Sequence, residues 1–294
     1  MNDFINNLIV SARRKLISAG IETSNYELRL LLAAALGIDI SELPNYTQKP
    51  QSKQIADFEQ MTEQRLHRMP ADKILGHRGF YKYDFAVSAD VLSPRQDTEI
   101  LLEAALECAI STKAESILEL GIGSGCVVSS LLAEIPALRA VGVDISAPAL
   151  EIAQKNALAL GVAERLRLIN KDWFAADFMS NMPTGFDIIV SNPPYIPSAE
   201  IAALDAEVKD YDPMVALDGG KDGLDCYRRI AEFASDLLKS EGNVFLEVGE
   251  GQAHDVAEIF AAAGLQPTKI CKDLSGVERC VCLKKISCNP QIIM

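Results

Sequence analysis

Hydrophobic residues follow two different periods along the chain, and the change between them predicts two regions. Up to about residue 75, apolar residues recur every three or four positions, as between Phe4 and Ile17, which is typical of amphipathic helices. Ser24-x-x-Glu27 has the pattern of a helix N-cap, and Gly37 and Pro70 are typical of helix ends. Residues 1–75 therefore predict a bundle of three helices, the third over residues 52–69. The bundle serves either for packing alone or as a platform for a macromolecular substrate.

The next segment, residues 76–95, changes in character and is predicted to be a linker. Its aromatic and β-branched run, Phe80–Val87, favours a β-hairpin. Residues 96–294 then alternate short apolar runs with helical patterns, which predicts an α/β domain with a doubly wound, mainly parallel, seven-stranded Rossmann-like sheet. The expected strands are 117–120, 140–143, 166–169, 187–190, 244–248, 268–272 and 277–283, and the expected helices include 125–133, 148–160, 224–239 and 254–263.

The charge is distributed unevenly between these regions. The chain has 294 residues and a formal net charge of −13. The first 75 residues carry nine basic and nine acidic side chains, so the whole excess of negative charge lies beyond them. We therefore expect no direct binding of nucleic acid. We also expect a cytoplasmic protein without membrane segments or a bound metal, because no 20-residue apolar run, signal-peptide pattern or C-x-x-C pair occurs.

Three glycines mark the turn that follows the first predicted strand of the α/β domain. The turn reads Gly121-Ile122-Gly123-Ser124-Gly125, and glycines at alternate positions let the backbone approach a ligand closely. The spacing differs from the G-x-G-x-x-G of dinucleotide-binding proteins. Tight strand-to-helix turns also occur without ligands, so the turn alone does not decide between structure and binding.

Two further strand ends complete a predicted nucleoside site. Asp144 ends the next strand, where a carboxylate can accept hydrogen bonds from both ribose hydroxyls. Trp173, the only tryptophan, follows the third strand, and its face suits an adenine ring, whose edge Asp172 or a nearby backbone group can hydrogen-bond. A packing role for Trp173 is the alternative. The absence of a phosphate-binding spacing and of a P-loop lysine favours S-adenosylmethionine over NAD or ATP, with S-adenosylhomocysteine as the product.

The fourth strand leads into Asn192-Pro193-Pro194-Tyr195, a stiff loop of unusual composition. The Asn192 side-chain carbonyl and the Pro193 backbone carbonyl can accept the two hydrogens of a planar NH2 group. Tyr195 can stack on that group and face the positive charge that develops on it. We predict Asn192, Pro193 and Tyr195 as catalytic residues and the four residues Asn192 to Tyr195 as the substrate-binding loop.

The chain resembles the release factor glutamine N5-methyltransferases over nearly its whole length. The matching stretches are Leu118-Glu-Leu-Gly-Ile-Gly-Ser-Gly125, Val143-Asp-Ile-Ser146, Asp172-Trp-Phe174, Phe186-Asp-Ile-Ile-Val-Ser-Asn-Pro-Pro-Tyr-Ile-Pro197, Ala216-Leu-Asp-Gly-Gly-Lys-Asp-Gly-Leu-Asp225 and Leu246-Glu-Val-Gly249. The chain departs from the family pattern at Ser93 and Gln96, where Ile and Pro are usual, and at Asp212-Pro213, where Glu-Pro is usual.

The resemblance implies a class I methyltransferase fold with a small N-terminal helical domain for substrate recognition. It implies methyl transfer to the glutamine side chain of the Gly-Gly-Gln motif in class 1 peptide chain release factors, in support of translation termination. The implied cofactor contacts are Gly121 to Gly125, Asp144, Trp173 and Asn192. By the same resemblance, residues Asn192 to Tyr195 hold the substrate glutamine.

Three other functions stay open on the residues alone. Adenine N6 presents the same planar NH2 as glutamine, so a DNA or RNA adenine methyltransferase is one alternative, although the acidic domain disfavours it. A glutamine methyltransferase acting on a ribosomal protein is another. The third is a noncatalytic scaffold, which the presence of both the glycine turn and the Asn192 loop disfavours. Asp205, Glu207 and Asp210 follow that loop and form either a mobile acidic lid or a solvated face.

Overall fold

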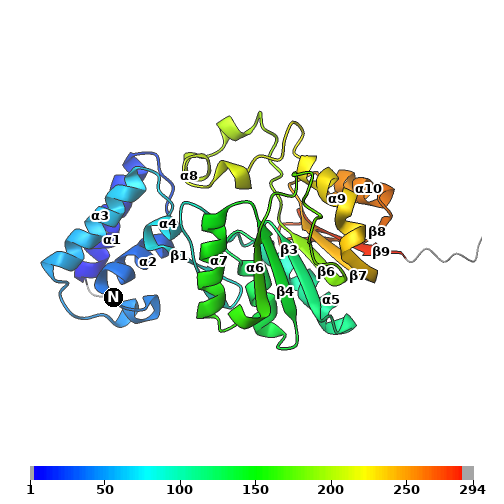
Figure 1. Ribbon diagram of the computed structural model, residues 1–294. Coiled ribbons are helices and arrows are strands. Elements are labelled where there is room, and N and C mark those ends of the chain that lie inside the picture. Colours follow the sequence, from blue (N-terminus) through cyan, green and yellow to red (C-terminus); the bar gives the residue numbers. More distant parts are fainter. Residues whose placement is uncertain (1–2, 287–294) are drawn as a thin grey trace, which may run out of the picture. The chain divides into compact units, whose positions relative to one another are not determined.

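The computed structural model describes residues 3–286 and divides into two compact units (Figure 1). The helical unit comprises the chain up to His77 together with Asp205–Tyr211. The sheet unit comprises Arg78–Leu204 and the chain from Asp212 onward. The helical unit is therefore built from two stretches that lie far apart in the sequence.

Helices form in the first stretch of the helical unit where the apolar period predicts them. They are α1 (Asp3–Ser18), α2 (Asn25–Leu36), α3 (Ser52–Leu66) and the short α4 (Ala71–Leu75), with a 3-10 turn η1 (Ile40–Asn45). Ser24 Oγ accepts a hydrogen bond from the Glu27 amide at 3.0 Å, and Gly37 ends α2 at φ +71°. Helix α3 ends three residues before the predicted end, because Arg68 adopts a positive φ of 65°. Buried Ile and Leu side chains of α1 and α2 fill the core.

The second stretch of the helical unit carries the short helix α8 (Ala206–Lys209). Its Glu207 carboxylate lies 3.7 Å from Arg65 and 3.4 Å from Arg68. Tyr211 Oη donates a hydrogen bond to the His67 carbonyl at 2.6 Å. The expectation of a mobile lid or a solvated face is therefore wrong for Glu207, which is held by two arginines of the same unit.

The sheet unit contains seven strands in the order β5-β4-β3-β6-β7-β9-β8. The first five strands in this order, from β5 to β7, are parallel to one another, and β9 runs antiparallel to its neighbours β7 and β8. This confirms the predicted mainly parallel sheet. The strands are β3 (Ser116–Leu120), β4 (Arg139–Asp144), β5 (Leu166–Asn170), β6 (Phe186–Ser191), β7 (Leu238–Glu247), β8 (Leu265–Lys272) and β9 (Glu278–Lys285). A separate two-stranded sheet pairs β1 (His77–Phe80) with β2 (Tyr83–Ala86).

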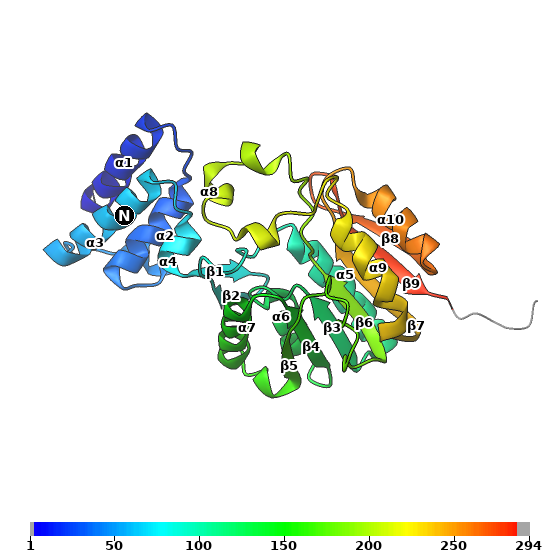
Figure 2. The ribbon, with the colours of Figure 1, turned by 45° about the horizontal axis from the view of Figure 1, so that its top comes forward.

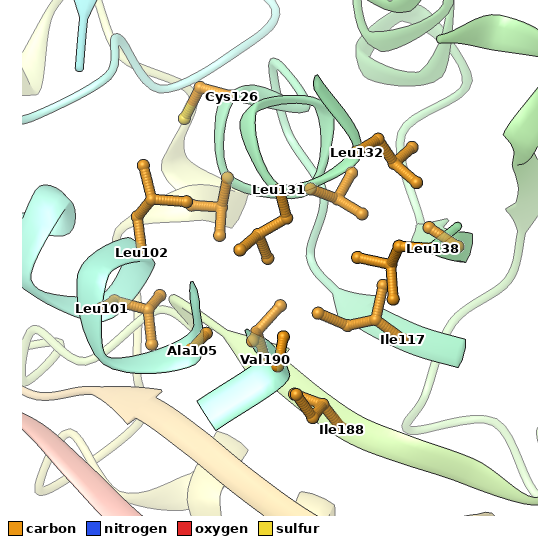
Figure 3. Close-up of a cluster of buried hydrophobic side chains, with 14 of the residues drawn as sticks. Leu101, Leu102, Ala105, Ile117, Cys126, Leu131, Leu132, Leu138, Ile188 and Val190 are labelled. Atoms are coloured by element: carbon orange, nitrogen blue, oxygen red, sulfur yellow. The ribbon is translucent and has the colours of Figure 1, made fainter. Parts of the chain in front are cut away.

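Helices cover both faces of the large sheet (Figures 1 and 2). They are α5 (Thr98–Thr112), α6 (Cys126–Glu134), α7 (Ala147–Ala159), α9 (Asp225–Leu237) and α10 (Ala253–Ala262), with 3-10 turns η2 (Ala163–Arg165), η3 (Ile201–Ala203) and η4 (Met214–Ala216). Side chains alternate between the faces along each strand. Ile188 and Val190 pack with α5 and α6, where Leu102 and Leu131 meet them (Figure 3), whereas Ile189 faces the core under α9 and α10.

The strand order reverses between β3 and β6, and this reversal positions the site. From β3 the chain builds outward through β4 and β5, and it then returns to add β6 on the other side of β3. Ser191 pairs with Leu120 at the carboxyl ends of the two strands, and Ser191 Oγ donates to the Leu120 carbonyl at 2.7 Å. Ligands of such sheets bind in the crevice that opens at this point.

The predicted end of α9 also differs from the structure. The helical pattern predicts α9 through Lys239, but the helix ends at Leu237 and β7 begins at Leu238. Leu238 pairs with Phe186 in the sheet, and Lys239 Nζ lies 2.7 Å from the Asp187 carboxylate at the start of β6. Pairing in the sheet thus overrides the local helical pattern. Across residues 3–286, no helix combines the length and apolar character that a membrane crossing requires.

Candidate active site

A cavity of about 650 Å³ opens at the carboxyl edge of the sheet, where the strand order reverses. Both predicted loops contribute to its wall. The predicted site residues that line it are Gly121, Ile122, Gly123, Ser124, Asp144, Asp172, Trp173, Asn192 and Pro194. Three predicted residues, Gly125, Pro193 and Tyr195, are not part of this lining.

The glycine turn is shaped by its neighbours as well as by any ligand. The amides of Gly121 and Ile122 both donate to the Val143 carbonyl, at 2.9 and 3.0 Å. Gly121 has a φ of +71°, and a Cβ there would lie 3.1 Å from Cη2 of Trp173. Gly125 serves packing, because a Cβ there would lie 3.2 Å from the Ala153 Cβ of α7. The last glycine of the pattern therefore fits helix packing rather than ligand contact.

Asp144 lies at the end of β4 with its carboxylate fixed in place. Its Oδ2 accepts a hydrogen bond from the Gly123 amide and its Oδ1 accepts one from the Ser146 amide, both at 2.9 Å. Burial raises the pKa of Asp144, and the backbone hydrogen bonds from Ser146 and Gly123 oppose that shift. Each oxygen keeps a further lone pair, so a rigid pair of acceptors faces the cavity.

Trp173 packs inside the protein and also lines the cavity, and its contact with adenine stays a prediction. Its indole packs against Gly121 and also lines the cavity, and its buried Nε1 has no hydrogen-bond partner among residues 3–286. Asp172 Oδ1 accepts a hydrogen bond from the Phe174 amide at 2.8 Å. The Phe174 side chain lines the same cavity and is 52% exposed. The structure thus offers a second aromatic surface next to the one that the sequence singled out.

The Asn192 loop presents Asn192 to the cavity and keeps Tyr195 behind it. Asn192 Nδ2 donates a hydrogen bond to Thr98 Oγ1 at 3.3 Å. Tyr195 packs against the core under α9 and α10, and its carbonyl accepts a hydrogen bond from Gln252 Nε2 at 2.9 Å. Burial raises the pKa of Tyr195 to about 12. The predicted stacking role of Tyr195 and acceptor role of the Pro193 carbonyl stay predictions.

A second segment, residues 216–220, packs against the Asn192 loop and is hydrogen-bonded to the residue that follows it, Ile196. The Ile196 amide donates to the Leu217 carbonyl at 3.0 Å, and the Gly219 amide donates back to the Ile196 carbonyl at 2.9 Å. A Cβ at Gly219 would lie 2.7 Å from Tyr195 Cα and 2.8 Å from the Pro194 carbonyl oxygen, closer than real Cβ contacts. The glycine is therefore required by the close approach of the two backbones. The family resemblance covers this segment but assigns it no role.

Sequence reasoning missed several polar residues around the loops. Arg95 pairs with Asp212 at 2.6 Å and lines the cavity. Glu119 is buried beneath the glycine turn, where its Oε2 accepts a hydrogen bond from the Val128 amide and burial raises its pKa to about 8. Thr98 and Glu247 lie beside Asn192. Glu247 lies one residue before the end of the strand predicted over residues 244–248, at the same sheet edge as Asn192, and this position is the signal that could have found it.

No metal centre is evident in the described part of the chain. Among residues 3–286, no three or more His, Cys, Asp or Glu side chains are grouped so that they could hold a metal ion. The arrangement that is present is a rigid acceptor pair, aromatic surfaces and an oriented amide around one cavity. Such a site can hold a nucleoside and place a planar NH2 group beside it.

Comparison with known proteins gives matches over both units. Residues 93–207 match the family model described as methyltransferase small domain, and residues 7–76 match the one described as PrmC N-terminal domain. A release factor glutamine methyltransferase from Rhodospirillum rubrum is 43% identical over 92% of this chain and 82% of its own length. One from Cereibacter sphaeroides is 42% identical over 91% of this chain and 93% of its own. A solved methyltransferase from Pyrococcus furiosus aligns with 79% of this chain and 99% of its own at 16% identity and a TM-score of 0.49.

Proposed function

Because the chain belongs to the release factor glutamine methyltransferase family, we propose that it methylates a glutamine side chain of a release factor. The acceptor atom is the side-chain amide nitrogen, N5, of the glutamine in the Gly-Gly-Gln motif of class 1 peptide chain release factors. The methyl donor is S-adenosylmethionine. The single observation that carries the proposal is that the glycine turn and the Asn192 loop open into one cavity.

The cavity wall fits the donor in size and in chemistry. A volume of about 650 Å³ falls within the usual range for small-molecule sites. Asp144 offers two fixed oxygens to the ribose hydroxyls, and Trp173 and Phe174 offer apolar surface to the adenine ring. When bound, S-adenosylmethionine supplies a methyl group on a positively charged sulfur. The glycine turn leaves room for the methionine part of this ligand, because no Cβ projects from Gly121 or Gly123.

On the acceptor side, the protein orients a weak nucleophile. An amide nitrogen has a delocalised lone pair, so its attack depends on geometry and on acceptors for the charge that develops. Asn192 Oδ1 accepts one N–H of the glutamine amide, and the Pro193 carbonyl accepts the other. As the nitrogen gains the methyl group, the bond between that methyl group and the sulfur breaks, and the nitrogen releases one of these hydrogens as a proton to solvent. No strong base is needed, since the alkylated nitrogen is acidic.

The helical unit is proposed to present the release factor, in line with its match to the PrmC N-terminal domain. Its surface charge is balanced over the first 75 residues, whereas the rest of the chain is acidic. That division suits recognition of a protein rather than of nucleic acid. We propose the cytoplasm as the site of the reaction, because the proposed substrate acts in translation.

A labelling experiment with three acceptors tests the function. The full chain is incubated with methyl-labelled S-adenosylmethionine and a release factor, the same factor with its Gly-Gly-Gln glutamine changed to alanine, or DNA. We expect label only on the unaltered release factor. Equal label on the altered factor, or label on DNA, would overturn the substrate assignment. A ribosomal protein included as a fourth acceptor separates the closest alternative.

Stabilisation of the chain by added ligand tests cofactor binding, and so distinguishes the proposed enzyme from a scaffold that does not bind the cofactor. S-adenosylmethionine and S-adenosylhomocysteine should each raise the melting temperature of the chain. A ligand at 100 times its dissociation constant stabilises the folded state by about 2.7 kcal/mol. The single tryptophan, Trp173, lies in the cavity wall and gives an independent fluorescence readout. An unchanged melting temperature at saturating ligand would favour the scaffold.

A further inference from the structure

Glu247 is a buried carboxyl that the proposed reaction does not yet use. It ends β7 next to the loop, because β6 and β7 are parallel and Ser191 pairs with Leu246 one residue earlier. The residue is 2% exposed, and its Oε2 has no hydrogen-bond partner within residues 3–286. A carboxyl group is rarely buried without a reason, since burial penalises its charged form.

The neighbours of Glu247 lead directly to Asn192. Thr98, at the start of α5 and 3% exposed, accepts a hydrogen bond from Asn192 Nδ2 through its Oγ1. Asn192 and Glu247 each follow directly after the paired residues Ser191 and Leu246, and interactions with Thr98 and Asn192 oppose the rise that burial causes in the pKa of Glu247. Thr98 and Asn192 line the cavity, whereas Glu247 lies behind them. The three side chains form a network that begins in the core and ends at the acceptor site.

The chemistry of this network fixes which way the Asn192 amide points. An ionised carboxylate can only accept hydrogen bonds, so it must face the NH2 end of Asn192 and not the carbonyl end. The Thr98 hydroxyl can donate to Glu247 while its oxygen accepts from Asn192. With Nδ2 held on both sides, Oδ1 is the atom left to receive an N–H of the acceptor.

We propose that Thr98 and Glu247 are positioning residues that hold Asn192 with its Oδ1 toward the acceptor amide. This inference rests on the proposed function for its choice of acceptor. It extends that function by naming two residues from α5 and β7 that act through Asn192 without touching the substrate amide. If Glu247 is protonated it can also donate a hydrogen bond, and the orientation of Asn192 is then no longer unique.

The proton on Glu247 therefore provides a readout of the network. Burial raises the pKa of Glu247 to about 7, against hydrogen bonds from Thr98 and Asn192. The charged and titratable groups that face it are Asp97, Arg279, Tyr195, Tyr227 and Cys126. Tyr195 and Cys126 have pKa values raised to about 12, and those of Tyr227 and Arg279 are also raised. Glu119 also lines the cavity, and burial raises its pKa to about 8, so a titration near neutral pH can come from either carboxyl. The Glu247→Gln variant shows which of the two carboxyls is responsible.

The first test separates kcat from cofactor binding. Thr98→Val removes the hydroxyl and keeps the shape, and we expect kcat for the release factor to fall about 10- to 100-fold. Thr98→Ser restores the hydroxyl and should recover most of the activity. The dissociation constant of S-adenosylmethionine, by calorimetry, should change less than about threefold. Thr112→Val in the same helix serves as the matched control and should resemble the wild type, because the Thr112 hydroxyl donates to the Cys108 carbonyl, away from Asn192.

The second test varies pH, and its first readout, an NMR resonance, does not depend on turnover. In ¹⁵N NMR spectra of the full chain, the Asn192 side-chain NH2 resonance should shift as pH passes about 7 in the wild type and stay constant in Glu247→Gln. The kcat of the wild type should rise through the same range, and that of Glu247→Gln should be lower and flat. An Asn192 resonance that titrates equally in both proteins, or a Thr98→Val variant that loses cofactor affinity as much as kcat, would overturn the inference. If the wild-type chain shows the NMR titration but does not label the release factor, the proposed substrate is wrong and the network of Thr98, Glu247 and Asn192 is still supported.

Discussion

The two sides of the cavity are held in place in different ways. On the donor side, the glycine turn and Asp144 support each other over a sequence separation of 21 residues, through backbone hydrogen bonds at two adjacent strand ends. On the acceptor side, Asn192 bonds to Thr98, 94 residues earlier, and Tyr195 bonds to Gln252, 57 residues later. The donor side is a local structure, whereas the acceptor side is assembled from distant segments.

This difference predicts how each side responds to mutation. A change on the donor side should weaken cofactor binding and leave the geometry of the acceptor loop intact. A change on the acceptor side should lower the rate of transfer while cofactor binding persists. The variants below test that separation, from the largest expected effect to the smallest.

Asn192→Ala should have the largest effect on turnover. It removes the oxygen that orients and stabilises the acceptor amide in the transition state, which typically costs about 10²- to 10³-fold in kcat. The dissociation constant of S-adenosylmethionine should change little. Initial rates with labelled cofactor and calorimetry check both numbers, with Asn243→Ala at the other end of the sheet as control. Near-normal turnover of Asn192→Ala would remove the mechanism.

Gly219→Ala should displace the acceptor loop while it leaves the polar side chains of the site unchanged. The added Cβ would lie 2.7 Å from Tyr195 Cα, so the loop backbone must shift. We expect a loss of about 1–3 kcal/mol in stability and a larger loss in kcat than in cofactor affinity. Gly79→Ala is the matched control, because a Cβ at Gly79 meets nothing within 4 Å. If both variants behave alike, the segment 216–220 does not support the loop.

Asp144→Ala should weaken S-adenosylmethionine binding by about 1–3 kcal/mol, because ribose hydroxyls and two backbone amides lose their acceptor. The kcat at saturating cofactor should stay within a few-fold of the wild type. Asp187→Ala is the control, since Asp187 also accepts two backbone amides, from Glu115 and Ser116, but lies at the opposite end of the sheet. An unchanged dissociation constant for Asp144→Ala would remove the ribose role.

The smallest effect on the reaction is expected from Glu119, which acts on the pH dependence of stability. The pKa of Glu119 is about 8 in the folded chain and near 4.5 in the unfolded chain, so between these values the folded state binds more protons. Stability from this group is therefore present at low pH and is lost as pH rises toward 8, at no more than about 1.4 kcal/mol per pH unit. Glu119→Gln should flatten that decline. Denaturant unfolding followed by the fluorescence of Trp173, which reports on the sheet unit, measures it, and parallel pH slopes for both proteins would contradict the assignment.

The same contrast explains what the sequence could predict. The alternation of strands and helices and the spacing of Gly121, Gly123 and Asp144 are local patterns, and the structure places these residues together as expected. The apolar period misplaced the end of α9, because pairing of Leu238 with Phe186 is not visible in the local sequence. Thr98 and Glu247 were missed for a similar reason. Thr98 looks ordinary on its own helix, and Glu247 is marked only by its position near a strand end; the sheet order brings both to Asn192.

The segment Asp205–Tyr211 has a practical consequence for anyone who divides the protein. A fragment that stops at His77 lacks Glu207, so Arg65, whose side chain is only 5% exposed, keeps its pair with Glu27 but loses its pair with Glu207. Such a fragment also loses the tyrosine hydroxyl that binds the His67 carbonyl. A helical fragment with all of these contacts therefore needs residues 205–211, joined by an added linker. This short segment belongs to the helical unit although it lies about 130 residues after His77 in the sequence.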